Sequence, residues 1–212
     1  MGRASGHACA AVGRVNSEQT RQFLELYARK IQAADQHLTE LDSAIGDADH
    51  GSNMERGMTA VVGTLPASGT PSDLLRSAAM TLISKVGGAS GPLYGTALLR
   101  AATSMAGKDE WTQDDLQEAL EAAYQGLLER GKAQPGDKTM LDVWRPALDA
   151  LPGGVGAAAQ AASSAAEATR DLTARKGRAS YLGERSAGHV DPGSVSSALL
   201  FEALAEALEQ RP

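Results

Sequence analysis

The chain has 212 residues, of which 42% are hydrophobic, 22% charged and only 4% aromatic, and its formal net charge at pH 7 is −6. This length is enough to bury one substantial core, so we expect a single domain. The acidic balance argues against nucleic acid or an anionic membrane as the main partner. No apolar run reaches the roughly 18 residues that span a bilayer. The single cysteine, Cys9, excludes a disulfide framework and favours the reducing cytoplasm.

The first residues differ in composition from the rest of the chain. Residues 1–15 are mostly small and rich in Gly and Ala, and we expect them to form a disordered N-terminal extension. Their longest apolar stretch, residues 8–12, is too short for the apolar region of a signal peptide. The folded domain is therefore expected to occupy residues 16–212.

Helical spacing of apolar residues recurs through the rest of the chain, and no segment shows the sustained alternation of a strand. Strands also favour aromatic residues, which are scarce here. We therefore predict an all-α single domain with about eight helices. Thr112 and Asp115 are spaced as a capping box, and Pro146 is expected to kink the helix that contains it. The predicted helices cover residues 17–34, 53–62, 72–86, 93–105, 112–127, 139–151, 157–175 and 194–209.

Polar, Gly-rich loops separate some of these helices, at residues 45–53, 86–95, 131–139 and 176–193. Alternate loops of an up-and-down helix bundle lie at the same end of the bundle. A single loop is explained by connection alone, but four loops dense in Gly, Asp, Lys and Arg favour a shared role. We therefore expect them to build one site at the mouth of the bundle.

Three carboxylates fall within eight residues at Asp42, Asp47 and Asp49. Carboxylates this close repel one another, so the stretch is either a solvated turn or a site for a hard cation such as Mg²⁺. On a helix their spacing would scatter the side chains. We therefore expect a loop, flexed at Gly46 and Gly51, that holds nucleotide phosphates through a metal ion.

Two other interpretations of this stretch differ in strength. An EF-hand is excluded, because Ser52 and Met58 stand where its glycine and its bidentate glutamate belong. A plain turn in which Asp47 or Asp49 caps the next helix stays open.

Three further segments offer groups that bind anions, and each has a plain structural alternative. Residues 87–91 place glycines and Ser90 before a helix, and the alternative is a simple turn between helices. Arg178 lies in a basic segment that is able to bind phosphate or to end a helix favourably. Residues 191–193 form a good helix N-cap. His50 and His189 are interpreted as surface imidazoles, with a phosphate contact as the alternative.

One motif is a false match. Gly126, Gly131 and Lys132 satisfy most of the P-loop pattern, but Ala133 occupies the Ser/Thr position and no strand precedes it. We interpret Gly131 as the glycine that ends a helix.

Four longer strings together resemble one family, the nucleotide-binding L subunits of dihydroxyacetone kinases. The resemblance extends from about Ser17 to the last helix. The strings are LDSAIGDADHGSNMERG (41–57), MTLISKVGGASGPLYGT (80–96), RGKAQPGDKTMLDVW (130–144) and ARKGRASYLGERSAGHVDPGS (174–194).

The resemblance implies an eight-helix antiparallel barrel with ADP or ATP at one mouth and two Mg²⁺ ions held by Asp42, Asp47 and Asp49. It also implies a catalytic role for Arg178. The nucleotide contacts that it implies are His50, Gly51, Ser52, Asn53, Ala89, Ser90, Gly131, Met140, Arg178, Asp191, Pro192 and Gly193.

The resemblance further implies a division of labour. A separate K subunit would hold dihydroxyacetone covalently on its own histidine, and this chain would present the γ-phosphoryl group. Its ADP would be retained and rephosphorylated by the phosphohistidine of an M subunit of the phosphotransferase system, which draws on phosphoenolpyruvate. This fits a chain with no evident nucleophile paired with a base.

Alternatives stay open at this point. The chain could serve a kinase for another short ketose such as erythrulose with exchangeable ATP, act as a nucleotide-dependent regulator, or be a helical interaction module without a ligand. Whether it forms a homo-oligomer is also open.

Overall fold

The structure, a computed structural model, describes residues 14–209. Within these residues the regular structure is helical, and extended backbone pairs only in an isolated bridge between Val15 and Trp111. The α-helices are α1 (Ser17–Ile45), α2 (His50–Thr64), α3 (Pro71–Lys85), α4 (Ser90–Ser104), α5 (Gln113–Gly131), α6 (Leu141–Ala150), α7 (Val155–Ala168) and α8 (Pro192–Glu209). Short 3-10 helices are η1 (Leu151–Gly153), η2 (Thr169–Asp171) and η3 (Arg178–Ser186).

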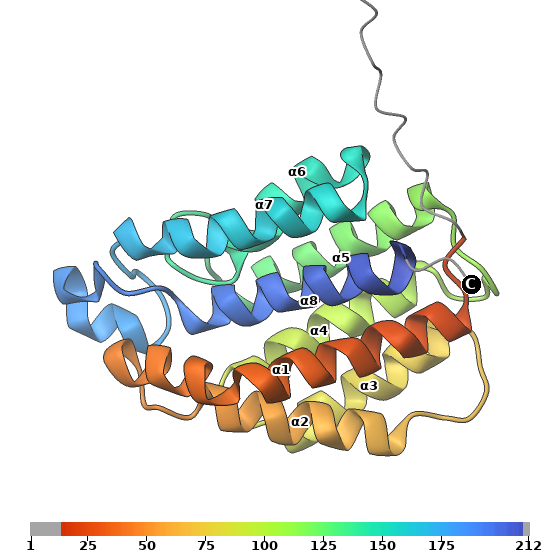
Figure 1. The fold of residues 1–212 in the computed structure, drawn as a ribbon, viewed down its shortest axis with the longest axis horizontal. Coiled ribbons are helices and arrows are strands. Elements are labelled where there is room, and N and C mark those ends of the chain that lie inside the picture. The colour runs from red at the N-terminus through yellow and green to blue at the C-terminus, as the bar shows by residue number, and fades with distance from the viewer. Residues whose placement is uncertain (1–13, 210–212) are drawn as a thin grey trace, which may run out of the picture.

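The helices close into a ring. Each α-helix packs against the next one along the chain, and α8 packs against α1. Figure 1 shows them running along the long axis of the molecule, with α8 between α1 and α7. Within the described part of the chain, the predicted all-α, eight-helix antiparallel barrel is therefore confirmed.

Aliphatic side chains fill the interior of the ring, as the low aromatic content requires. Leu24, Leu38 and Met54 are completely buried. Aromatic packing is local: the rings of Trp144 and Phe201 meet edge to face, with 5.1 Å between their centroids. The closely packed core holds the loops at each end in fixed positions.

Capping boxes set the starts of three helices. The predicted box of Thr112 and Asp115 opens α5 and is confirmed. Thr70 opens α3 two residues before the predicted start at residue 72, with Pro71 in the first turn. Asn16 caps α1, which begins at Ser17 as predicted. Each cap gives the first turn of a helix an acceptor for backbone N–H groups that have no partner within the helix.

The chain after α7 differs from the prediction, which continued this helix to residue 175. The α-helix ends at Ala168 and passes into η2. Beyond it, the Ala174 N–H donates to the Ser186 hydroxyl (2.8 Å) and the Arg175 N–H donates to the Asp137 carbonyl (3.0 Å). These donors bond to distant parts of the chain, so the Ala-rich pattern does not carry the helix further.

The predicted N-terminal extension lies mostly outside the described residues, which begin at Arg14. Val15 is buried, and it exchanges two backbone hydrogen bonds of 2.8 Å with Trp111. The packed part of the described chain therefore includes Val15, and the domain boundary at residue 16 stays a prediction.

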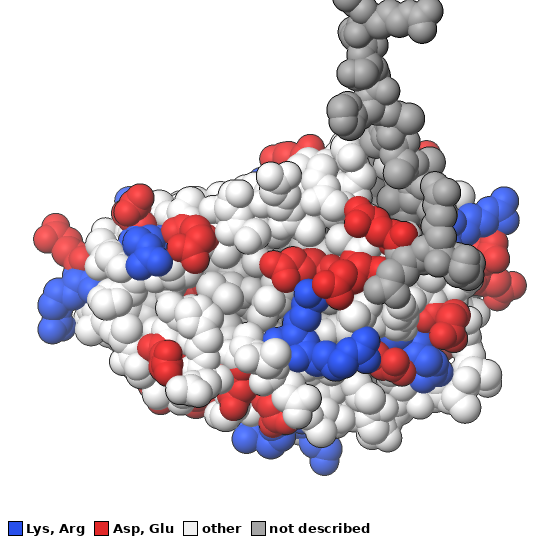
Figure 2. Space-filling view, in the orientation of Figure 1, with Lys and Arg blue, Asp and Glu red and all other residues white. Residues whose placement is uncertain are grey.

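The surface carries interspersed charges of both signs. On the face drawn in Figure 2, acidic and basic side chains adjoin where α1 runs beside α8. The Lys30 ammonium pairs there with Glu206 at 2.8 Å and with Glu202 at 3.4 Å. None of the helices in residues 14–209 is long and apolar enough to cross a membrane.

Two glycines of α2 make a matched test of the packing between α1 and α2. A Cβ atom on Gly51 would collide with the Asp35 carbonyl and with Thr39 of α1, whereas nothing lies within 4 Å of a Cβ on Gly63. We expect G51A to lower the free energy of unfolding by about 1–3 kcal/mol through overpacking. G63A should raise it by about 0.5–1 kcal/mol through better helix propensity. Urea unfolding followed by circular dichroism measures both free energies. Equal changes in G51A and G63A would contradict the close contact of α1 and α2 at Gly51.

Candidate functional site

Two adjoining cavities lie at the end of the barrel where the four Gly-rich loops meet. The polar cavity, of about 190 Å³, is lined by residues from all four loops, so the predicted meeting of these loops is confirmed. The wide cavity, of about 450 Å³, has a largely apolar lining that includes Leu127, Met140 and Leu141. Both cavities share seven lining residues: Gly88, Ala89, Leu93, Thr139, Met140, Lys176 and Gly177.

Four helices begin at the polar cavity. In an antiparallel ring every second helix starts at the same end, and here α2, α4, α6 and α8 do so. His50, Ser90, Met140 and Pro192, at or next to the first residues of these helices, all line the cavity. The N-terminus of a helix carries a partial positive charge and N–H groups without helical partners, so this end of the barrel favours an anion.

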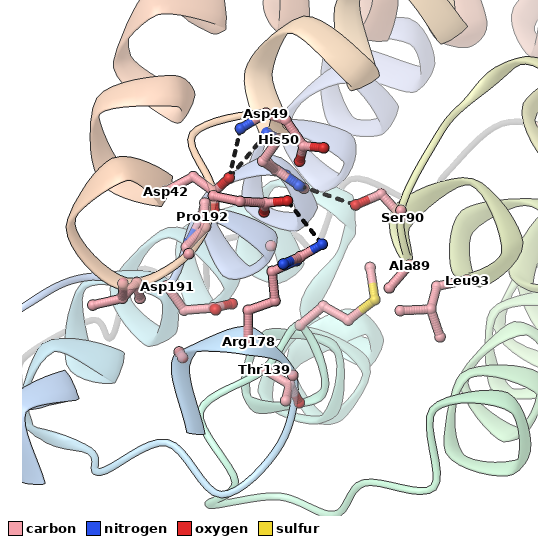
Figure 3. Close-up of a pocket in the computed structure, with 18 of the residues that line it drawn as sticks. Asp42, Asp49, His50, Ala89, Ser90, Leu93, Thr139, Arg178, Asp191 and Pro192 are labelled. Carbon is pink, nitrogen blue, oxygen red and sulfur yellow. Dashed lines mark hydrogen bonds and ion pairs between the residues drawn. The ribbon is translucent and has the colours of Figure 1, made fainter. Parts of the chain in front are cut away.

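The three aspartates come together at this end, though not from one loop as predicted. Asp42 lies in the last turn of α1, and Asp49 is the N-cap of α2. The Asp42 carboxylate accepts hydrogen bonds from the backbone N–H groups of Asp49 (2.8 Å) and His50 (3.1 Å), as Figure 3 shows. Asp42 therefore fastens the start of α2 to the end of α1, which the sequence spacing alone does not reveal.

The aspartates suit a hard divalent cation. One carboxylate oxygen from each of Asp42, Asp47 and Asp49 lies within 4.8 Å of the other two. Two ligands of a single Mg²⁺ lie at most about 4.2 Å apart, because each sits about 2.1 Å from the ion. A small movement of the carboxylates towards one another would therefore let all three bind one ion. Binding two neighbouring ions would require a smaller movement.

Arg178 of η3 reaches the same group. Its guanidinium lies 3.0 Å from a carboxylate oxygen of Asp47, and its side chain is 67% exposed. An ion pair this exposed contributes little stability. A metal cation bound by the aspartates would compete with the Arg178 guanidinium for the Asp47 carboxylate. Binding of the metal would therefore favour release of Arg178 from Asp47.

His50 is not the surface imidazole expected from the sequence. It is buried, and its ring nitrogens lie 3.0 Å from the Ser90 hydroxyl and 2.9 Å from the Ser196 hydroxyl. The Tyr94 hydroxyl lies 2.7 Å from the same Ser196 oxygen. Burial lowers the pKa of His50, against the attraction of Asp42 and Asp49. The imidazole thus links the cavity to a buried polar network, while His189 is exposed as expected.

Asp191 caps the start of α8. Its carboxylate accepts hydrogen bonds from the Ser194 N–H (2.7 Å) and from the Ser194 hydroxyl (2.9 Å). Burial nevertheless raises the pKa of Asp191 from 3.8 to about 6. The folded protein therefore holds this proton at pH values where the unfolded chain has lost it.

This shift predicts a pH-dependent effect of D191N. Ionising Asp191 costs folding free energy, so the wild type loses stability at this site between about pH 4 and pH 6 and stays lower above that range. The gain in unfolding free energy of D191N over the wild type should grow by up to about 3 kcal/mol across this range, at about 1.4 kcal/mol per pKa unit. Urea unfolding in EDTA at several pH values measures it, with D109N at an exposed site as control. A difference that does not change with pH would contradict the buried carboxyl.

The structure separates the predicted nucleotide contacts into two groups. Gly51, Ser52 and Asn53 do not line either cavity, although their backbone N–H groups lie in the first turns of α2. Gly131 ends α5 and lines the wide cavity, but Lys132, with φ 48°, takes the left-handed position expected for Gly131. The predicted residues that line a cavity are Asp42, Asp47, Asp49, His50, Ala89, Ser90, Gly131, Met140, Arg178, Asp191, Pro192 and Gly193.

Other lining residues were not singled out from the sequence. Lys138, Thr139 and Lys176 line the polar cavity, and so does Tyr94. All four lie within loops expected to form the site, at residues 86–95, 131–139 and 176–193. Loop membership was therefore the only signal in the sequence that pointed to them.

Comparison with known proteins identifies the family. A family model described as the DAK2 domain matches residues 44–206. The chain is 46% identical over 187 residues, covering 82% of it and 89% of the relative, to the ADP-binding subunit DhaL of the PEP-dependent dihydroxyacetone kinase of Escherichia coli (strain K12). It is also 46% identical over 191 residues, covering 89% and 96%, to the ADP-binding subunit DhaL of the PTS-dependent dihydroxyacetone kinase of Lactococcus lactis subsp. lactis (strain IL1403).

A solved structure supports the same assignment. The dihydroxyacetone kinase from C. freundii in complex with AMP-PNP and Mg²⁺ has a TM-score of 0.70 and 26% sequence identity over 97% of this chain. This chain spans 37% of the length of that larger protein. The chain therefore belongs to the DAK2 domain family, together with the ADP-binding subunits of dihydroxyacetone kinases.

Proposed function

We propose that this chain is the ADP-binding subunit of a PEP-dependent dihydroxyacetone kinase, and that it presents a phosphoryl group to dihydroxyacetone held on a separate K subunit. The observation that carries the proposal is the group of Asp42, Asp47 and Asp49, whose oxygens lie within 4.8 Å of one another where four helix N-termini meet. The 46% identity, over most of both chains, to two ADP-binding subunits of dihydroxyacetone kinases supports it.

The two cavities suit the two ends of a nucleotide. The polar cavity would take the phosphates, because helix N-termini, Ser90 and Arg178 offer donors and positive charge there. The wide cavity would take the base, because Leu93, Leu127 and Met140 give it apolar walls. The shared lining would place the sugar between them.

The metal would be held by the aspartates. We propose that two Mg²⁺ ions bind, since Mg²⁺ commonly takes one or two carboxylates and completes its shell with water and phosphate. When bound, the ions neutralise phosphate charge and help align the transferring group. Asp42 is held in place by the N–H groups at the start of α2, so it is the preorganised ligand of the three.

Arg178 would act on the transferring group itself. Phosphoryl transfer depends on alignment and on charge stabilisation more than on covalent chemistry by the protein. Arg178 is the guanidinium in the lining of the polar cavity, and it already reaches the carboxylate of Asp47. The acceptor hydroxyl and the group that activates it would come from the partner that holds the ketose.

We further propose that ADP is retained and rephosphorylated in place by an M subunit, consistent with the phosphoenolpyruvate and phosphotransferase-system dependence in the relatives' names. The location in the cytoplasm, expected from the single cysteine, stays a prediction.

Native mass spectrometry of the purified protein tests the proposal. We expect a mass increase equal to one ADP and two magnesium ions that survives gel filtration. Protein that carries no nucleotide, or that exchanges labelled ADP within seconds, would contradict retention. An assay with K and M subunits then compares dihydroxyacetone with erythrulose as acceptor, and failure to phosphorylate either ketose would contradict the kinase role.

A further inference from the structure

A charged side chain is buried beside the polar cavity without a role in the binding scheme above. Lys138 is 1% exposed. Its ammonium donates hydrogen bonds to the backbone carbonyls of Leu172 (2.9 Å) and Ser186 (2.6 Å). Burying an ammonium is costly unless its donors are satisfied, and these two bonds satisfy two of its three donors.

The two carbonyls mark the ends of one segment. Residues 172–186, called the strap below, leave the barrel after η2 and return towards α8, and Arg178 lies between the two ends. The Ala174 N–H also donates to the Ser186 hydroxyl, at 2.8 Å, and this bond joins the same two ends of the strap. Lys138 therefore joins two points that are 14 residues apart in the chain and that bracket Arg178.

Two other contacts hold the strap, and one of them is the hydrogen bond from the Arg175 N–H to the Asp137 carbonyl, at 3.0 Å. Ala174 and Ala179 form a small cluster with Ile45 at the end of α1, separate from the main core. Arg178 itself is largely exposed, and within the described part of the chain its ion pair is with Asp47 alone. The place of Arg178, which Figure 3 shows facing the aspartates, is therefore set by the backbone of the strap more than by packing of its own side chain.

The backbone at Lys138 indicates that its side chain matters. Its φ is 62°, in the left-handed region that glycine adopts more readily. A lysine here costs conformational energy that a glycine would avoid. The ammonium bonds to the strap are the evident compensation.

We propose that Lys138 is a positioning residue, whose ammonium draws together the two ends of the strap and so holds Arg178 at the phosphate end of the cavity. The kinetic part of this inference rests on the proposed function, in which Arg178 acts on the transferring phosphoryl group. The structural part concerns the strap alone and is tested without any partner.

Hydrogen exchange on the isolated chain tests the structural part. In K138M the amides of Ala174 and of the rest of the strap should exchange at least about 10-fold faster, while amides in the middle of α1 and α8 keep their rates. K132M is the matched control, since Lys132 is exposed and also has a positive φ of 48°. Unchanged strap rates, or an equal acceleration throughout the barrel, would overturn the inference.

Two further variants keep this test decisive. K138R retains donors and charge, so its strap should exchange more slowly than that of K138M. If K138M does not fold, K138Q replaces it, since its amide is one bond too short to reach both carbonyls. Strap exchange in K138Q at the wild-type rate would also overturn the inference.

A double-mutant cycle tests the kinetic part. K138M should lower kcat for phosphoryl transfer about 10- to 100-fold through misplacement of Arg178, with Mg·ADP affinity changed less than about 3-fold. In the R178A background the same substitution should change kcat less than about 3-fold, because the group that it positions is gone. Additive losses would assign Lys138 a general structural role. If R178A itself leaves kcat unchanged, the proposed role of Arg178 fails, and the exchange data still decide whether Lys138 holds the strap.

Discussion

Replacing Asp47 by asparagine is expected to weaken Mg·ADP binding by at least about 10- to 100-fold, the range measured when even outer-shell partners of metal ligands are removed. Asp47 is the best of the three aspartates for this test, because Asp42 also fastens the start of α2 and its loss would disturb the fold. D47N removes one negative charge and keeps the shape of the side chain. Isothermal titration of protein freed of nucleotide with EDTA measures the affinity.

Two controls separate a metal ligand from a general effect of charge. D109N, at an exposed site far along the chain, removes the same charge and should bind Mg·ADP within about 2-fold of the wild type. In EDTA the wild type and D47N should bind ADP equally weakly, because the difference between them requires the metal. If D47N bound Mg·ADP as tightly as the wild type does, Asp47 would not be a ligand of the metal.

R178A is expected to lower kcat for phosphoryl transfer by about 10³-fold or more, as loss of an arginine that stabilises the transferring group does in other phosphotransferases. Its affinity for Mg·ADP should change less than about 5-fold. The ion pair with Asp47 is exposed and worth at most about 1 kcal/mol, so removing it alters binding little. Single-turnover transfer with the partner subunits, together with titration of Mg·ADP, gives both values.

Variants at the same strap provide the comparison. R178K keeps the charge but not the planar pair of donors, so its rate should fall between those of R178A and the wild type. R185A removes an exposed arginine of η3 that does not line the polar cavity and should leave the rate nearly unchanged. Equal losses in R178A and R185A would indicate a general effect of positive charge on docking and not a contact with the phosphoryl group.

Local patterns in the sequence were sufficient for much of the barrel. Helical periodicity located all eight helices, and the capping box at Thr112 and Asp115 was found because both partners lie within one turn. The arrangement of the site loops also followed from local information, since alternate loops of an antiparallel ring share one end.

Features that depend on distant partners were not accessible from local patterns. Asp42 lies in the last turn of α1, and its carboxylate accepts hydrogen bonds from the N–H groups of Asp49 and His50 across the following loop. His50 is buried because Ser196, 146 residues later, meets its ring. The predicted end of α7, at residue 175, was wrong because the amides of Ala174 and Arg175 bond to Ser186 and Asp137 and do not continue the helix.

Lys138 illustrates the same limit at the site. Its ammonium bonds to carbonyls 34 and 48 residues further along the chain, so nothing in its own loop distinguishes it from the exposed Lys132. Both residues have positive φ, and only the three-dimensional structure shows that Lys138 is buried while Lys132 is exposed to solvent.

A crystal structure of the protein grown with Mn²⁺ and ADP would test the metal site most directly, because manganese scatters anomalously and can take the oxygen ligands of Mg²⁺. We predict manganese peaks about 2 Å from carboxylate oxygens of Asp42, Asp47 and Asp49, with the ADP phosphates on the opposite side of the ions towards Ser90 and the start of α4. Manganese bound elsewhere, with the three carboxylates turned apart into solvent around a bound nucleotide, would contradict the proposal that these aspartates anchor it.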